Sequence, residues 1–180
     1  SMIPLVFIGL LFGLKYGLLG GFIYALYNFG ADYIVYLDTL RITLESWTGE
    51  SWSLFKIGAL FLLDYGIPFM AFGLSGLFKD VSNVTQRLFY AFGFVSLIRL
   101  ISSSLSGILL WSSSIAYAVS EVDAGNMNPN IATMIFGAFN NSVIVYSILY
   151  NLIYITTTLI SSYFIALIIY KRVLTKVDVY

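Results

Sequence analysis

Four long apolar segments most constrain what this chain can fold into. They cover residues 2–28, 54–78, 88–111 and 142–170. Each exceeds the roughly 20 residues that a helix needs to cross the hydrocarbon core of a bilayer. Transmembrane barrel strands are much shorter and alternate strictly between apolar and polar residues, and these segments do neither. The segments therefore predict an all-α, polytopic membrane helical bundle.

The composition supports this class and limits the function. Of 180 residues, 59% are hydrophobic and 10% are charged, which leaves too little polar surface for a separate soluble domain, so residues 1–180 are expected to form a single integral membrane domain. The net charge of zero offers nothing to nucleic acid. Cysteine and histidine are absent, which excludes thiolate metal sites and removes the commonest catalytic base. We expect no metal site and no cofactor in this chain.

The first apolar segment has two interpretations. Lys15 lies at its centre, too deep for its ammonium group to reach water along its stem, which favours a break near Gly13–Gly17 and two shorter helices. One continuous helix would instead align a stripe of small residues for close helix packing. That stripe consists of Gly9, Gly13, Gly17 and Gly21.

The charge of the connecting segments predicts the orientation. The 79–87 loop and the C-terminus carry basic residues, whereas the 29–53 and 112–141 loops are mainly acidic. Basic loops stay on the cytoplasmic side, so we expect a multi-pass protein with a cytoplasmic C-terminus. The abundance of Phe and Tyr, together with Ile, Asn and Ser, suggests the cell membrane of an AT-rich bacterium. An interfacial belt on the external side would consist of Trp47, Trp52 and Trp111.

Polar residues inside the apolar segments carry the functional information. Asp64 lies about ten residues, or ~15 Å, below the outer end of its helix, and Arg99 lies at a similar depth on the next one. A charged group in hydrocarbon is costly, so both should face a polar interior. Pro68 has no N–H, which is expected to free the backbone carbonyl of Asp64.

Helical periodicity groups further polar residues with these two. One face of the 88–111 helix and one face of the last helix bring hydroxyls, an amide and aromatic rings to the same depth. This arrangement predicts an outward-opening cavity for a small organic molecule. The two faces consist of Arg99, Ser102, Ser103, Ser106, Gly107 and Trp111, and of Tyr146, Ser147, Tyr150, Asn151, Tyr154, Thr158 and Ser161.

The same residues also have purely structural interpretations, which the sequence leaves open. Asp64 and Arg99 would neutralise each other as an ion pair. The serines would bond to backbone carbonyls or pack helices together. Trp111 would anchor the protein at the membrane interface.

Four stretches resemble one known family. "GLKYGLLGGFIYAL", "LLDYGIPFMAFGLSGLF", "LIRLISSSLSGILLW" and "YSILYN" are similar to the S components of energy-coupling factor (ECF) transporters, most closely to the thiamine-specific type. The resemblance covers residues 3–170 as short local matches. It implies a six-helix fold whose first helix has no counterpart here, so that either the chain is truncated or this member is reduced. It also divides the first segment near Lys15. The implied spans are about 3–14, 17–29, 54–78, 88–111 and 142–170.

The resemblance also implies a ligand-binding site. This chain departs from the family at two positions, with Asp64 where the family has glutamate and Ser103 where it has histidine. The 29–53 loop is longer than in the family, and Tyr33 is only a candidate for the ligand tyrosine of that loop. Matched position by position, the implied ligand-binding residues are Asp64, Tyr65, Arg99, Ser103, Gly107, Trp111, Tyr146, Ser147 and Asn151.

The function implied is that of a high-affinity vitamin-binding subunit of an ECF-type ABC importer. The expected ligand is thiamine or a derivative. Its thiazolium would face Asp64, kept in place by Arg99, and its aminopyrimidine would stack on Trp111 and bond to Asn151. The implied partners are a transmembrane T component, two ATPase subunits and the lipid bilayer, and this chain itself is not expected to be an enzyme.

Other functions remain as alternatives. An S component for riboflavin, folate or a pyridoxine-like vitamin would share the fold. A non-transport structural membrane subunit would use the polar stripes only for helix packing. An intramembrane serine hydrolase is disfavoured, because the chain has no histidine and these helices have no deep lysine to act as a base.

Overall fold

The computed structural model describes residues 2–34 and 36–172, without the side chains at positions 2, 33, 34, 37, 40 and 48. Over these ranges the chain is helical and contains no strand, as predicted. A π-helical turn at Gly30–Ile34 follows the second helix, and a 3₁₀ turn at Leu74–Phe78 follows the fifth. The α-helices are α1 (Met2–Phe12), α2 (Leu14–Phe29), α3 (Leu37–Thr48), α4 (Leu54–Leu60), α5 (Ile67–Gly73), α6 (Val84–Leu109), α7 (Ser112–Asp123), α8 (Ile131–Ala138) and α9 (Val143–Arg172).

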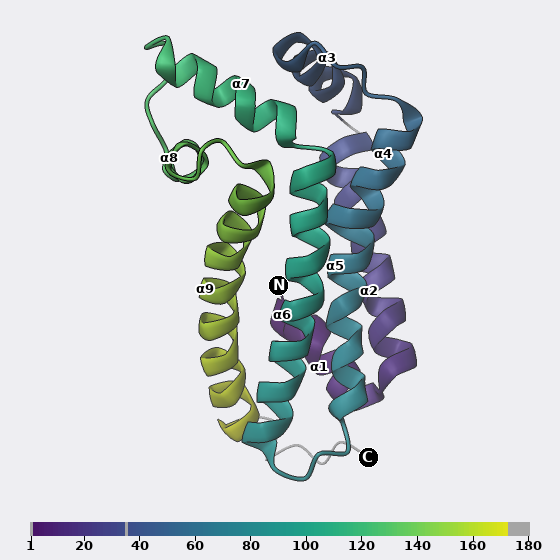
Figure 1. The fold of residues 1–180 in the computed structure, drawn as a ribbon. Helices are drawn as coiled ribbons and strands as arrows, with labels where there is room; N and C mark the ends of the chain where they lie inside the picture. The colour runs from purple at the N-terminus through teal and green to yellow at the C-terminus, as the bar shows by residue number, and fades with distance from the viewer. Residues whose placement is uncertain (1, 35, 173–180) are drawn as a thin grey trace.

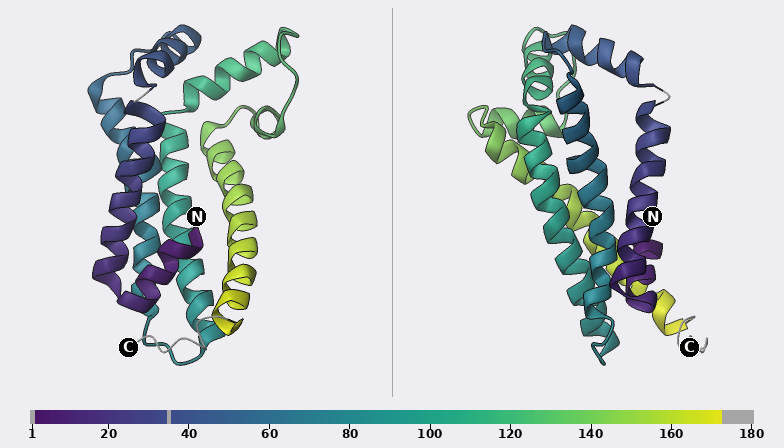
Figure 2. Two further views of the ribbon diagram at one scale, coloured as in Figure 1. Left: turned by 180° about the vertical axis from the view of Figure 1, so that it is seen from behind. Right: turned by 90° about the vertical axis from the view of Figure 1, so that its right-hand side faces the viewer.

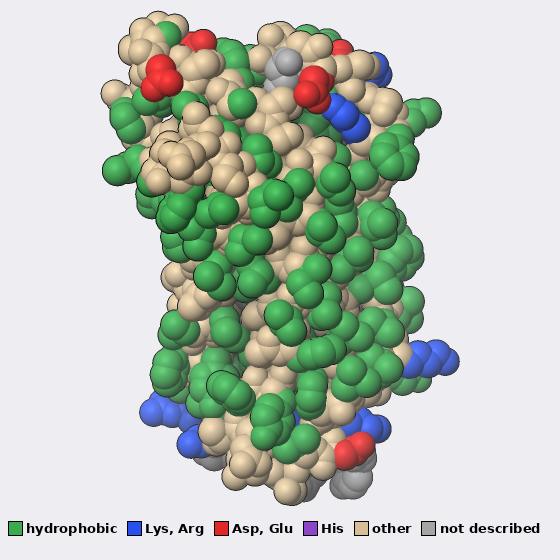
Figure 3. All heavy atoms as spheres, in the orientation of Figure 1, with side chains coloured by type: hydrophobic (Ala, Val, Ile, Leu, Met, Phe, Trp, Pro, Cys, Tyr) green, Lys and Arg blue, Asp and Glu red, His purple; other side chains and the backbone are tan. Residues whose placement is uncertain are grey.

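Three helical stretches of the described chain are long and apolar enough to cross a membrane: Leu54–Phe78, Val84–Leu109 and Val143–Arg172. They stand side by side in Figure 1. Hydrophobic side chains cover the middle of the face drawn in Figure 3, and charged side chains gather toward its two ends. This distribution matches a membrane protein with transmembrane helices.

The predicted break in the first apolar segment is confirmed, and it falls at Gly13. Gly13 has a φ of 86°, a left-handed conformation that glycine adopts without steric cost. The chain turns back there, so that α1 lies across the lower end of α2 (Figure 2). Lys15 is exposed in the first turn of α2. The two helices have 11 and 16 residues, so the expected spans 3–14 and 17–29 are shorter than the three membrane-crossing stretches.

The small-residue stripe also has its predicted packing role, even though the helix is broken. Gly17 lies against Gly73 of α5 so closely that a Cβ on Gly17 would be 2.7 Å from the Gly73 carbonyl oxygen. A Cβ atom essentially never comes that close to a backbone oxygen, so only glycine permits this crossing of α2 and α5. The interpretation as one continuous helix is therefore wrong, whereas the packing role that it gave to the glycines holds for Gly17.

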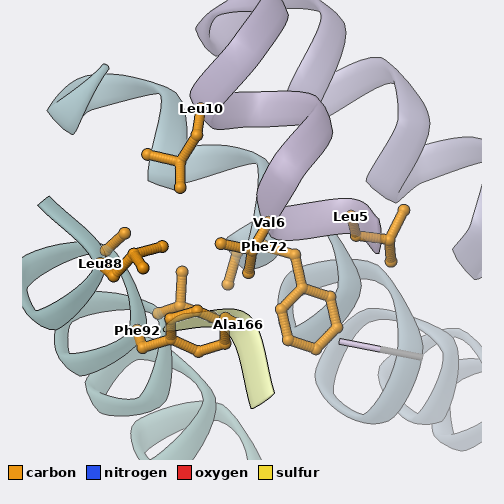
Figure 4. Close-up of a cluster of buried hydrophobic side chains, with 10 residues drawn as sticks. Leu5, Val6, Leu10, Phe72, Leu88, Phe92 and Ala166 are labelled. Carbon is orange, nitrogen blue, oxygen red and sulfur yellow. The ribbon is translucent and has the colours of Figure 1, made fainter. Parts of the chain in front are cut away.

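Two buried apolar clusters hold the bundle together. The larger one fills the end where α1 crosses the other helices (Figure 4), and its labelled members are Leu5, Val6, Leu10, Phe72, Leu88, Phe92 and Ala166. The smaller one lies at the opposite end and consists of Leu44, Trp52, Leu60 and Leu110. Because Trp52 is only 4% exposed, the prediction that it anchors the membrane interface is wrong.

The 29–53 and 112–141 segments, predicted as loops, are largely helical. The helices α3, α7 and α8, which we call the helical cap, gather at one end of the bundle (Figure 1). Trp47 of α3 stacks on Tyr117 of α7 with ring centroids 5.9 Å apart. Glu45 accepts hydrogen bonds from the backbone N–H of Trp52 (2.8 Å) and from Nε of Arg41 (3.0 Å). These two donors, the backbone N–H first, hold the pKa of Glu45 below its usual value.

Candidate ligand-binding site

Asp64 lies on a π-helical segment, Phe61–Gly66, that interrupts the first membrane-crossing stretch, Leu54–Phe78, before Pro68. In this segment the N–H of Ile67 bonds five residues back, to the carbonyl of Leu62. With that spacing the missing N–H of Pro68 frees the carbonyl of Leu63, not that of Asp64 as predicted. The hydroxyl of Ser102 on α6 donates to this carbonyl at 2.7 Å. Ser102 therefore fixes the irregular turn that carries Asp64.

The carboxylate of Asp64 is half-buried and points toward Trp111, whose indole Nε1 donates to its Oδ2 at 3.1 Å. The predicted support of Asp64 by Arg99 is wrong. Within residues 2–34 and 36–172, no ion pair joins Asp64 to Arg99. The guanidinium of Arg99 instead lies over the ring of Phe72, 5.1 Å from its centroid. Arg99 lies about three helical turns below Trp111. Its guanidinium is therefore at a different depth from the indole that binds the carboxylate of Asp64.

A first cavity of about 190 Å³ opens beside Asp64. The rings of Tyr146 and Tyr150 form one wall, stacked with centroids 5.6 Å apart. Ser106 is 1% exposed, and its hydroxyl lies beside the carboxylate of Asp64 without meeting the geometry of a regular hydrogen bond. Buried hydroxyls are normally satisfied, so we expect the hydroxyl of Ser106 to turn toward Asp64 or toward a bound molecule. The lining residues are Asp64, Ser103, Ser106, Gly107, Trp111, Tyr146, Ser147, Tyr150 and Asn151.

A second cavity of about 350 Å³ adjoins the first, since Asp64 and Ser103 line both. It contains two carboxylates and one guanidinium. The hydroxyl of Tyr65 donates to Oδ2 of Asp32 at 3.1 Å. The lining residues are Asn28, Asp32, Asp64, Tyr65, Pro68, Phe69, Arg99, Ser103 and Tyr154.

The two cavities together contain all nine residues that the sequence singled out. Seven line the first cavity, and Tyr65 and Arg99 line only the second. Sequence reasoning missed Asn28 and Asp32, which stand one helical turn apart at the end of the second helical segment. Their spacing was a usable signal, but Asp32 was counted only as loop charge. The side chain of Tyr33 lies outside the described residues.

Three of the nine residues also join α9 to α6. The hydroxyl of Ser147 donates to the carbonyl of Ser104 at 2.8 Å. The side-chain amide of Asn151 donates to the carbonyls of Ser103 (3.3 Å) and Ser147 (2.8 Å). Gly107 faces Ser147 with no room for a Cβ. The structural interpretation therefore holds for these residues in addition to their place in the cavity wall, and their ligand contacts stay a prediction.

Fold and site together define a helical membrane protein with a polar, aromatic-walled cavity near its capped end. Comparison of the chain with protein-family models, with curated proteins and with solved structures finds no match to any of them. The function must therefore be argued from the site itself.

Proposed function

We propose that this chain is the membrane-embedded, high-affinity vitamin-binding subunit of an ECF-type ABC importer, and that its ligand is thiamine or a thiamine derivative. One observation carries the proposal. Residues far apart in the sequence, chosen for their depth and for their resemblance to S components, line two adjoining cavities that meet at Asp64. Some of these residues also pack α9 against α6, but Asp64 and Tyr146 line the cavity without such a bond to a neighbouring helix among the contacts described above.

The chemistry of the cavities suits an aromatic cation. The larger one, at about 350 Å³, falls in the range of about 300–1,000 Å³ typical of small-molecule sites. Trp111 and the Tyr146–Tyr150 pair offer aromatic faces for a ring. Asp64 offers a negative charge at the junction. Asn151 uses its amide nitrogen to hold α6, which leaves its carbonyl oxygen to accept a hydrogen bond from the edge of a heterocycle.

In this proposal the chain binds and its partners supply the energy. A T component and two ATPase subunits would complete the importer, and ATP hydrolysis would reside in the ATPases. The cavities lie toward the helical cap, which the acidic loops assign to the external side of a bacterial membrane, with the C-terminus cytoplasmic. The hydroxyls of Ser102 and Ser147 are engaged with backbone carbonyls, which is a packing role and gives no support to a hydrolase.

One observation favours a second candidate, a structural membrane subunit without a ligand. Ser102, Ser147 and Asn151 all bond to the backbone of a neighbouring helix, as residues that only hold a bundle together do. The half-buried carboxylate of Asp64 has no explanation in that candidate.

The test is a thermal-shift screen of the purified protein in detergent against thiamine, riboflavin, folate and pyridoxine, followed by calorimetry. Thiamine is expected to stabilise the protein most. Asp64→Asn keeps the shape of the side chain and should lower thiamine affinity at least tenfold, or ~1.4 kcal/mol. Asp80→Asn, at the opposite end of the bundle, is the control. Unchanged binding by Asp64→Asn would refute the assignment, and the absence of any ligand would favour the structural subunit.

A further inference from the structure

The second cavity has an unequal balance of charge. Two carboxylates, Asp32 and Asp64, and one guanidinium, Arg99, line the same space. With Arg99 offsetting one carboxylate, one negative charge remains for a ligand to balance. Without Asp32 the count would be even, and the cavity would favour neither sign. The ligand's charge therefore depends on Asp32, in the π-helical turn that follows α2.

Asp32 is held in its place by a contact across the fold. Tyr65, 33 positions further along the chain, donates its hydroxyl to Oδ2 of Asp32. Tyr65 is itself seated between aromatic neighbours, with Phe29 and Phe69 at centroid distances of 5.5 and 5.9 Å. One oxygen of the Asp32 carboxylate is thus directed at the cavity wall. An exposed carboxylate without such a contact would sample many rotamers and would give a weaker, less directed field.

The guanidinium of Arg99 belongs to a largely buried side chain in the wall of the second cavity. It lies against Phe72, whose side chain is 2% exposed, and Arg99 itself is 9% exposed. Asp32 belongs to the π-helical turn Gly30–Ile34, and its side chain is exposed. Because two carboxylates and one guanidinium line the second cavity, a ligand bound between Asp32 and Asp64 would meet mainly negative charge.

The remaining walls favour an organic cation over a metal ion. Tyr65, Phe69 and Tyr154 present rings to the cavity, and aromatic faces attract cations. Within the described ranges, no three acidic, histidine or cysteine side chains come together as a metal site would require. We propose that Asp32, positioned by Tyr65, makes the cavity select an organic monocation, with Asp32 and Asp64 on either side of the positive charge. This inference rests on the proposed ligand-binding function and names the charge of its ligand.

The experiment compares wild-type protein with Asp32→Asn by calorimetry, using thiamine, N-methylpyridinium and riboflavin as probes. Asparagine keeps the shape and can still accept from Tyr65, so only the charge is lost. Asp123→Asn, at the end of α7, removes the same charge outside the cavity. Because Asp32 is exposed and screened, we expect Asp32→Asn to lower thiamine affinity about fivefold. Asp123→Asn should change it less than twofold, and added salt should weaken wild type more than Asp32→Asn.

The outcomes separate this inference from the proposed function. Equal thiamine affinity in wild type and Asp32→Asn overturns the inference and leaves vitamin binding intact. Riboflavin as the tightest ligand does the same, because it is uncharged. Binding of N-methylpyridinium that depends on Asp32, without binding of any vitamin, supports the inference and sinks the vitamin assignment. Binding of none of the probes overturns both.

Discussion

Gly107 is the point where α6 and α9 approach most closely beside the cavity, and Gly107→Ala tests whether that approach holds the site together. A Cβ on Gly107 would overlap the hydroxyl of Ser147 and lie 3.0 Å from its Cβ. The added Cβ would therefore displace this hydroxyl, which donates to the carbonyl of Ser104 at 2.8 Å. Either Ser147 changes rotamer and loses this bond, or α9 moves away from α6.

The cost follows from these two responses. Overpacking a tight interior contact costs about 1–3 kcal/mol, and loss of the Ser147 hydrogen bond costs about 1 kcal/mol. Because the two responses are alternatives, the free energy of unfolding should fall by about 1–3 kcal/mol relative to the same Gly→Ala change at an uncrowded position of the helix. Gly93→Ala is the matched control on the same helix, since a Cβ there meets nothing within 4 Å. It should leave stability unchanged or raise it slightly, because alanine favours helix by about 1 kcal/mol over glycine.

A double-mutant cycle with Ser147→Gly completes the test. Ser147→Gly alone removes the hydrogen bond and adds a helical glycine, which together cost about 2 kcal/mol. It also makes room for the Cβ of Gly107→Ala, so the double variant should be no less stable than Ser147→Gly alone. Reversible unfolding in detergent micelles measures the three variants. Equal stability of Gly107→Ala and Gly93→Ala, or strictly additive losses in the double variant, would refute the close packing of α6 on α9.

Two further predictions concern the irregular turn and the cap. Ser102→Ala removes the donor to the Leu63 carbonyl, so the unfolding free energy should fall by about 1 kcal/mol; Ser120→Ala, an exposed serine of α7, should cost less, and equal losses would contradict the role of Ser102. The pKa of Glu45 is lower in the folded protein, so its stabilising effect is full above the usual value of 4.5 and is lost as the pH falls below it. Glu45→Gln should abolish this part of the pH dependence in thermal unfolding between pH 3 and about 6, and an unaltered profile would contradict it.

The parts of the fold that sequence predicted best are those that composition dictates. Apolar runs of more than about 20 residues leave few alternatives to membrane-crossing helices, and the two later spans lie within a few residues of α6 and α9. The start of α6 was missed by four positions because Asn83 caps the helix, its side chain accepting from the N–H of Gln86. The cavity residues followed from helical periodicity, which places residues at the same depth on the same face.

The features that escaped prediction depend on contacts between distant segments. The π-helical turn shifts the freed carbonyl from Asp64 to Leu63, and nothing local in the sequence distinguishes the two registers. Arg99 lies on Phe72 because the guanidinium and the ring meet in the folded bundle. The cap helix α3 escaped because a short amphipathic helix between apolar spans resembles a polar loop. Asp32 was counted as loop charge, and its bond to Tyr65, a residue distant in the sequence, exists only in the folded bundle.

The polar residues of the cavity differ in how far packing alone accounts for them. Ser102, Ser147 and Asn151 each satisfy a backbone carbonyl of another helix, and each would be needed in an empty bundle. The carboxylate of Asp64 accepts a hydrogen bond from the indole of Trp111. An asparagine at this position would accept the same bond without the cost of a half-buried charge. Neutral donors, here the indole of Trp111 and the nearby hydroxyl of Ser106, do not fully offset that cost. The charge of Asp64 is therefore the feature that packing leaves unexplained, and a cation bound in the cavity would explain it.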